Sequence, residues 1–143
     1  LPSDILQKDK GNAQKEIARI LSQTQLSFSD NFNLELKAID GERSMKADIS
    51  LSCPVSIEQI HEMYEIYDDH NFAFPVSSVV NVKEVSGTDK CVISLNKPDD
   101  STLRIEAVAD PRMRGGAGEA VHIMNLLFGL HEKTGLALKA SDF

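Results

Sequence analysis

The sequence predicts a single α+β domain in which a mainly antiparallel sheet of about five strands carries helices packed on one face. Two neighbouring segments alternate apolar and polar residues, and a helix with a capping box follows them. The 143 residues suffice for one hydrophobic core but are short for two. With 41% hydrophobic and 26% charged residues, the composition is that of an ordinary folded protein and excludes disorder.

The N-terminal segment is predicted to be a polar arm followed by a short helix. Residues 1–10 are polar and include a proline, so we expect an arm there and a folded domain over 11–143. Residues 12–23 place Ile17 and Leu21 at helical spacing, which indicates an amphipathic helix.

Two strands are predicted next, at 32–39 and 45–52. Apolar residues alternate with polar ones along both segments, and the turn between them falls at Asp40 and Gly41. We therefore expect an antiparallel pair with one buried face and one solvated face.

A second helix is predicted over 57–67. Pro54 ends the preceding strand, and Ser56 with Gln59 three residues later forms a capping box in front of an apolar helical pattern. Residues 72–75 are expected to form a loop. Three further strands are predicted at 79–85, 91–95 and 103–109, with the turn of the last hairpin at Pro98-Asp99-Asp100.

The third predicted helix follows a glycine-rich turn at 115–118 and is apolar over more than half of its circumference. A helix of this kind is usually buried on two sides. We therefore expect it to pack on the sheet and also against a partner domain or a second copy of the chain.

Charge and cysteine content exclude several classes of protein. The net charge of −7 and the scattered basic residues argue against nucleic-acid binding. Cys53 and Cys91 form no CxxC pair, which favours a reducing, cytoplasmic compartment. Neither a signal peptide nor a membrane-spanning run is visible. The first residue is Leu rather than Met, so the chain is expected to be a fragment or a processed product.

The segment 109–126 resembles a signature of the N-acetyl-γ-glutamyl-phosphate reductases, in which an Asp-Asn segment leads through Lys and a Gly-Ala-Ala/Ser-Gly turn into a helix reading Gln-Ala-Val-Gln-Asn-Met-Asn. Residues 85–93 and 54–69 are similar to two further segments of that family, so about the last two thirds of the chain match in order. Aspartate-semialdehyde dehydrogenases share the fold and a looser version of the same tail.

The resemblance implies the C-terminal domain of a reductase that combines an NADP-binding Rossmann domain with a dimer-forming α+β domain closing over the active site. The chain has no GxGxxG fingerprint, so NADP is expected to bind only through an absent Rossmann domain. The isolated chain is expected to be an inactive homodimer from the arginine pathway. The alternatives are the assembly or ligand-binding domain of a divergent paralogue, or the corresponding domain of an aspartate-semialdehyde dehydrogenase.

The same resemblance assigns the candidate site. Backbone amides at a helix N-terminus can meet an anion, so the glycine-rich turn is a candidate cofactor contact, with a tight turn for close packing as the alternative. Arg114 replaces the family's Lys as a candidate substrate-binding cation, with an ordinary surface arginine as the alternative. Glu119 carries a carboxylate where the family has Gln. The candidate cofactor-binding residues are Gly116, Ala117, Gly118 and Glu119.

No catalytic or metal-binding residue is predicted within the chain. The nucleophilic cysteine of the family lies on the Rossmann half, and Cys53 and Cys91 are expected to be packing residues. The family's acid/base histidine has no counterpart at 12–17 or 40–43. The four histidines have no metal-ligand spacing and are expected to be solvated or hydrogen-bonded: His61, His70, His122 and His131.

Overall fold

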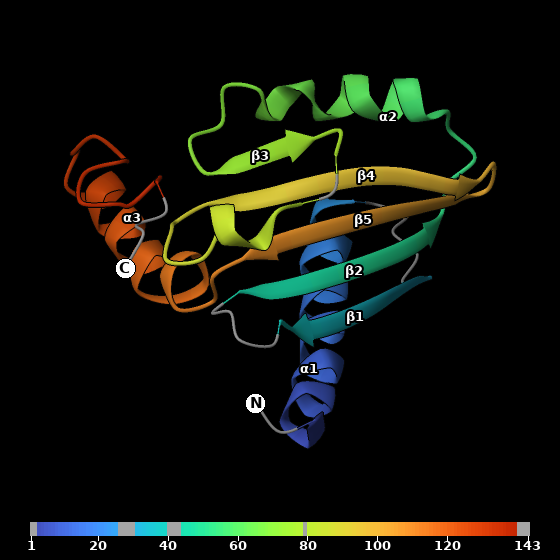
Figure 1. The fold of residues 1–143 in the computed structure, drawn as a ribbon, viewed down its shortest axis with the longest axis horizontal. Coiled ribbons are helices and arrows are strands. Elements are labelled where there is room, and N and C mark those ends of the chain that lie inside the picture. The colour runs from blue at the N-terminus through green and yellow to red at the C-terminus, as the bar shows by residue number, and fades with distance from the viewer. Residues whose placement is uncertain (1–2, 26–30, 40–43, 79, 140–143) are drawn as a thin grey trace.

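In the computed structural model, residues 3–25, 31–39, 44–78 and 80–139 are described. Over these residues the chain forms three α-helices and five strands (Figure 1). The elements in chain order are α1 (Ser3–Thr24), β1 (Phe32–Ala38), β2 (Met45–Ser52), α2 (Ile57–Tyr64), β3 (Ala73–Val76), β4 (Cys91–Asp99), β5 (Thr102–Ala109) and α3 (Gly118–Leu127).

The strands form one sheet in the order β1-β2-β5-β4-β3. All neighbours are antiparallel except β3 and β4, which are parallel. The predicted α+β class with a mainly antiparallel sheet is therefore confirmed. The alternation of β1 and β2 places Leu34 opposite Ile49, and Ile49 opposite Ile105 on β5, so one face of the sheet is apolar.

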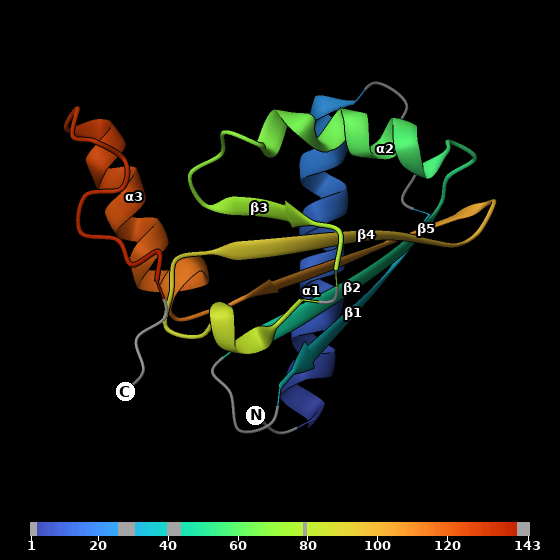
Figure 2. The ribbon, with the colours of Figure 1, turned by 45° about the horizontal axis from the view of Figure 1, so that its top comes forward.

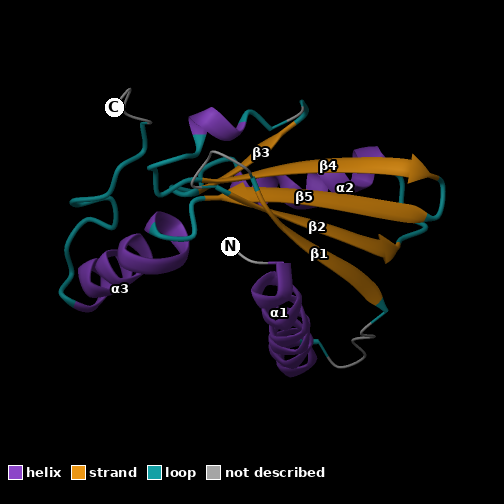
Figure 3. Ribbon diagram, turned by 60° about the horizontal axis from the view of Figure 1, so that its bottom comes forward, coloured by secondary structure: helices purple, strands orange, loops and turns teal. Residues whose placement is uncertain are grey.

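Helices α1 and α2 lie on this apolar face (Figures 2 and 3). The core beneath α2 is built around the buried residues Ile60, Leu95 and Leu103. The helix begins as predicted, because the hydroxyl of Ser56 accepts a hydrogen bond from the backbone N–H of Gln59 at 3.3 Å. Between the two helices and the sheet runs an apolar groove of about 640 Å³.

The opposite face carries a charged network across β1, β2 and β5. Three carboxylates lie side by side in register, Glu35 beside Asp48 and Asp48 beside Glu106. Asp48 is 8% exposed and lies 3.0 Å from the Arg104 guanidinium. Burial alone would raise the pKa of Asp48, but the hydrogen bond from Arg104 and the charges of Lys46, Arg104 and Lys37 together lower this pKa below its ordinary value of 3.8.

Asp48→Asn is expected to weaken the dependence of stability on acid pH. A lowered pKa means that ionised Asp48 stabilises the fold above the ordinary pKa of 3.8, and that this contribution is lost as the pH falls through the lower folded-state pKa. Urea unfolding between about pH 6 and about pH 2 should show a flatter profile for the variant than for the wild type. Asp100→Asn, on an exposed turn residue, is the control. Parallel profiles for wild type and Asp48→Asn would contradict this expectation.

Lys97 joins the β4–β5 hairpin to the segment between β2 and α2. Its ammonium donates hydrogen bonds to the carbonyl oxygens of Cys53, Val55 and Asp100, each at 2.7 Å. Lys97→Met keeps most of the aliphatic stem but removes these charge-assisted bonds, and should lower the free energy of unfolding by about 2 kcal/mol. The exposed Lys83 provides the control Lys83→Met. Equal urea midpoints for the two variants would show that the three bonds contribute nothing.

Three sequence expectations differ from the structure in the N-terminal half and the middle of the chain. Helix α1 begins at Ser3, so residues 3–10 of the segment expected to be a polar arm are part of the helix. The strand predicted at 79–85 is wrong, since Val82–Glu84 form a short 3-10 helix and the fifth strand is β3. Strand β3 (Ala73–Val76) overlaps the segment 72–75, for which a loop is predicted. The predicted turn at Asp40 and Gly41 lies outside the described residues.

Helix α3 lies beyond one end of the strands rather than on the sheet (Figures 1 and 3). Gly118 and Asn125 are its buried residues, and the expectation that the helix packs on the sheet is wrong. Its apolar side chains are open to solvent, with Leu127 78% and Phe128 76% exposed. The prediction of a large apolar surface on this helix holds, but the domain's own sheet does not cover it.

Candidate functional site

Two fully buried carboxylates fix the turn that precedes α3. Asp110, at the end of β5, accepts hydrogen bonds from the backbone N–H groups of Gly87 at 2.9 Å and Arg112 at 2.9 Å. Asp89 accepts from the N–H of Ala137 at 2.7 Å and donates its own N–H to the Ala137 carbonyl at 2.7 Å. The two residues therefore anchor both the turn and the segment after α3.

Gly118 lies directly against Asp89. A Cβ added at this position would be 1.6 Å from Asp89 Oδ1 and 2.7 Å from the carbonyl oxygen of Met113. The same Oδ1 is buried and has no hydrogen-bond partner in the described part of the chain. Glycine is therefore required at 118 for the close approach of α3 to Asp89, not for an unusual backbone angle, because its φ of −64° is helical.

The predicted cofactor contacts lie in a turn of π-helical form over Met113–Ala117. The amides of Gly115 and Ala117 donate to the carbonyls of Asp110 and Arg112, and the amide of Gly118 donates to Met113. These bonds make the turn tight, as the packing alternative requires. Gly116 and Ala117 are exposed on the surface, whereas Gly118 is buried. The cofactor-binding role of Gly116, Ala117, Gly118 and Glu119 stays a prediction.

Arg114 is held on three sides. Its guanidinium carbon lies 4.6 Å from the centre of the buried Phe72 ring. Nη1 lies 3.1 Å from Oε2 of Glu119 and 3.4 Å from Nδ1 of His122. The predicted substrate cation is thus 19% exposed and already paired with the carboxylate that replaces the family's Gln.

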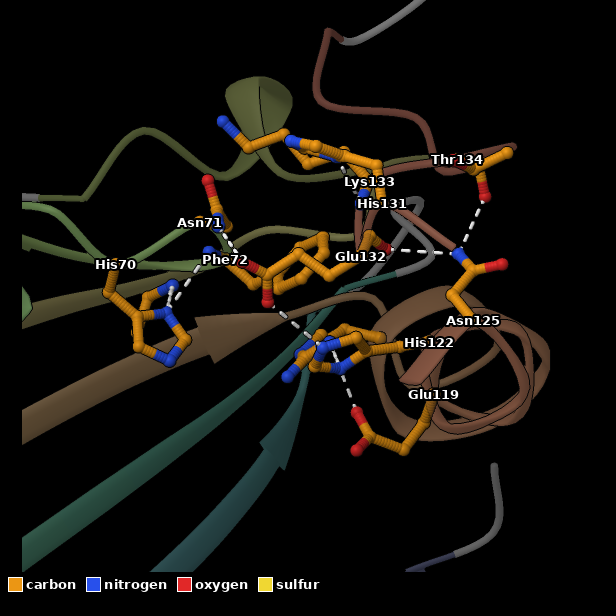
Figure 4. Close-up of polar contacts among 12 residues, drawn as sticks. His70, Asn71, Phe72, Glu119, His122, Asn125, His131, Glu132, Lys133 and Thr134 are labelled. Carbon is orange, nitrogen blue, oxygen red and sulfur yellow. Dashed lines mark hydrogen bonds and ion pairs between the residues drawn. The ribbon is translucent and has the colours of Figure 1, made fainter. Parts of the chain in front are cut away.

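His122 and Asn125, one turn apart on α3, connect the helix to the segment that follows it (Figure 4). His122 Nε2 lies 3.3 Å from Oε2 of Glu132, and the other oxygen of Glu132 accepts from the side-chain amide of Asn71. The side-chain amide of the buried Asn125 donates to the carbonyls of Glu132 at 3.1 Å and Thr134 at 2.9 Å. Together these contacts fold residues 132–134 back over the helix.

The sequence does not indicate that Arg114 stacks on Phe72 or that His122 contacts Glu132. Phe72, Asn71 and Glu132 lie far from the glycine-rich turn along the chain and belong to no motif, so only the fold brings them to it. Asn125 was detectable as the last residue of the family signature, although not its role in binding two carbonyls.

The cysteines and the other histidines occupy ordinary structural positions. Cys53 packs at the edge of the core beneath α2. Burial raises the pKa of the Cys91 thiol, and the nearby Arg114 charge offsets this rise only in part. His70 Nδ1 accepts hydrogen bonds from the amides of Phe72 and Ala73, and His131 Nδ1 accepts one from Lys133. His61 is exposed on α2.

The described part of the chain shows neither a metal site nor a membrane-spanning helix. Among those residues, no group of three or more His, Cys, Asp or Glu side chains is arranged to hold a metal ion. None of the helices found there combines the length and the apolar character needed to cross a membrane.

No protein-family model matches the chain. Among solved structures, aspartate semialdehyde dehydrogenase II from Vibrio cholerae aligns with a TM-score of 0.48 and 22% identity, covering 60% of this chain and 27% of the other.

Curated sequences give a much stronger match. The chain is 41% identical over 129 residues to the N-acetyl-gamma-glutamyl-phosphate reductase of Parabacteroides distasonis, and 36% identical over 129 residues to that of Phocaeicola vulgatus. Both matches cover 90% of this chain and 40% of the relative. The chain therefore spans less than half of the length of these enzymes. Over nine tenths of its own length, it is homologous to one part of the N-acetyl-gamma-glutamyl-phosphate reductases.

Proposed function

We propose that this chain is the dimer-forming and substrate-side domain of an NADP-dependent reductase that converts N-acetyl-γ-glutamyl phosphate to its semialdehyde in arginine biosynthesis. The observation that carries the proposal is 41% identity to a named reductase over 90% of the chain, together with a match to only 40% of that enzyme. NADP binding is assigned to a Rossmann domain outside this chain, since the chain itself has no dinucleotide fingerprint. Its two cysteines are free thiols, in keeping with a cytoplasmic enzyme.

The exposed apolar side of α3 supports a role beside another domain. Four apolar side chains of the helix and that of its C-cap residue are 44–78% exposed, a surface that a complete protein normally covers. We assign this surface to the contact with the nucleotide-binding domain and assign homodimer formation to the sheet. The apolar residues concerned are Ile123, Met124, Leu126, Leu127 and Phe128.

Arg114 is proposed to bind an anionic group of the substrate. Guanidinium groups suit phosphate and carboxylate recognition, and Arg114 lies next to the turn that leads into α3. The turn residues Gly116, Ala117 and Glu119 are then placed where a cofactor held by the other domain would approach. The carboxylate of Glu119 must be turned away from any phosphate at this point, because like charges repel.

A second candidate is a non-catalytic assembly or ligand-binding domain of a divergent paralogue. The observation that favours it is the Arg114–Glu119 ion pair at 3.1 Å, which neutralises the cation that a substrate would need. In that case the chain would form the dimer without taking part in turnover.

The isolated chain is expected to be a dimer that does not bind NADPH. Sedimentation equilibrium should first establish the dimer, and calorimetric titration with NADPH at the same concentration should then give no saturable heat. Saturable binding near a micromolar dissociation constant would contradict the assignment of the cofactor to another domain. A monomer at all concentrations would contradict the role in dimer formation.

A further inference from the structure

A directed line of hydrogen bonds runs from Arg114 through the imidazole of His122 to Glu132. Figure 4 shows the part of the line between His122 and Glu132. Arg114 Nη1 lies 3.4 Å from Nδ1 of His122, and Nε2 of the same ring lies 3.3 Å from Oε2 of Glu132. Glu132 in turn accepts from Asn71 through its other oxygen. The line thus joins the glycine-rich turn, α3, the segment after α3 and Asn71.

The chemistry of the end groups fixes the state of the ring. A guanidinium can only donate, so Nδ1 of His122 must be the acceptor and carry no proton. A carboxylate can only accept, so Nε2 must carry the ring proton and donate it to Glu132. The arrangement is therefore satisfied by one form alone, the neutral imidazole with its proton on Nε2.

Packing holds the ring and the guanidinium in one place. Phe72 is fully buried. The centre of its ring lies 4.6 Å from the centre of the His122 ring and 4.6 Å from Cζ of Arg114. The side chain of His122 is 13% exposed and that of Arg114 is 19% exposed. The imidazole of His122 and the guanidinium of Arg114 therefore both pack on the Phe72 ring, and rotation of either group would break the hydrogen bond between them.

We propose that His122 is the positioning residue of Arg114. In its neutral Nε2–H form, oriented by Glu132, the ring holds the guanidinium on Phe72. The remaining donors of the guanidinium are then directed to an anionic ligand. What Arg114 binds rests on the function proposed above, whereas the positioning does not. The family signature that this segment resembles has Gln at the position of His122. A Gln side chain can likewise accept from Arg114 through its oxygen and donate to Glu132 through its nitrogen.

Glu119 is the competing partner of Arg114 on the same helix. It is 43% exposed and contacts Nη1 at 3.1 Å, so its ion pair is open to solvent and is expected to be weak. The side chain of His122, by contrast, is only 13% exposed. We therefore assign the orientation of Arg114 to His122 and Phe72, and treat Glu119 as a displaceable neighbour.

The first test is the tautomer of His122 in the full 143-residue chain. Long-range ¹H–¹⁵N correlation spectra at neutral pH should show Nε2 protonated and Nδ1 unprotonated in the wild type. The same tautomer should persist in Glu132→Gln, because Arg114 still donates to Nδ1 and the Gln oxygen can still accept from Nε2. A proton on Nδ1 in the wild type would overturn the proposal, because Arg114 could then not donate to it.

The second test compares His122→Gln with His122→Leu, reading the order of the Arg114 side chain from ¹⁵N relaxation of its Nε–H group. The order parameter should stay near about 0.8 in the wild type and in His122→Gln and fall below about 0.6 in His122→Leu. Equal order in all three proteins would overturn the positioning role, whether or not the variants are less stable. Titration with inorganic phosphate is read separately at Arg114. An ordered guanidinium that shows no phosphate-dependent shift would contradict the proposed substrate anion and leave the positioning intact.

Discussion

Gly118→Ala is expected to lower the free energy of unfolding by about 3 kcal/mol or more, the largest effect of any Gly→Ala change among the described glycines. The new Cβ would lie 1.6 Å from Asp89 Oδ1, and Asp89 cannot retreat because two hydrogen bonds hold it to Ala137. The methyl group would also lie 2.7 Å from the carbonyl oxygen of Met113. Helix α3 would have to move away from the sheet end. Urea unfolding followed by circular dichroism measures the loss.

The control is Gly115→Ala in the same turn. There the nearest atom to an added Cβ is Cβ of Pro111 at 3.7 Å, an ordinary contact, so the change should stay within about 0.5 kcal/mol. The φ of −64° at Gly118 is helical, and alanine would be favoured there by propensity alone. A neutral or stabilising Gly118→Ala would therefore show that Asp89 does not occupy this position.

Asn125→Asp should destabilise the chain by about 3 kcal/mol at neutral pH. The change keeps the shape but replaces the amide nitrogen that donates to the carbonyls of Glu132 and Thr134 with a carboxylate oxygen that cannot donate. An ionised group would then lie fully buried against two carbonyl oxygens. The segment after α3 should lose protection first.

Amide hydrogen exchange locates that loss. Exchange of the Leu136 amide, which donates to the carbonyl of Lys133 at 3.1 Å, should accelerate in Asn125→Asp more than exchange within the sheet. Asn12→Asp, at an exposed position of α1, is the isosteric control and should leave both unchanged. Unaltered exchange at Leu136 would mean that Asn125 does not hold this segment.

Short-range patterns in the sequence predict most of the sheet. The alternation at 32–39 and 45–52 corresponds to β1 and β2, because a strand with one buried face must repeat every two residues. Ser56 caps α2 as expected, since the cap depends only on a residue three positions away. These elements are specified by residues close to one another in the chain and can therefore be predicted from local sequence patterns.

Elements that depend on distant partners were not predictable in this way. The strand β3 is four residues long and includes Pro75, and it exists because it pairs in parallel with β4. An edge strand tolerates such a proline. The apolar residues near Val82 suggested a strand, yet they are apolar because they pack on the small core around Val85, Val92 and Val108.

The candidate site likewise combines features that the local sequence predicts with features that depend on distant contacts. The glycine-rich turn and Arg114 follow from the family signature, which is local. The stacking of Arg114 on Phe72 and the line through His122 to Glu132 require the sheet end, α3 and its following segment to meet. The sequence predicts the apolar character of α3, but it does not indicate whether this surface packs on the sheet, on another domain or on a second copy of the chain.

The most direct test of the account is a chimera of the Parabacteroides distasonis reductase in which the matched 40% of that enzyme is replaced by this chain. NADPH binding and a dimer are expected, together with turnover of N-acetyl-γ-glutamyl phosphate that is reduced relative to the parent and lost on Arg114→Met. A folded, NADPH-binding dimer with no turnover would contradict a role in catalysis and favour the assembly domain.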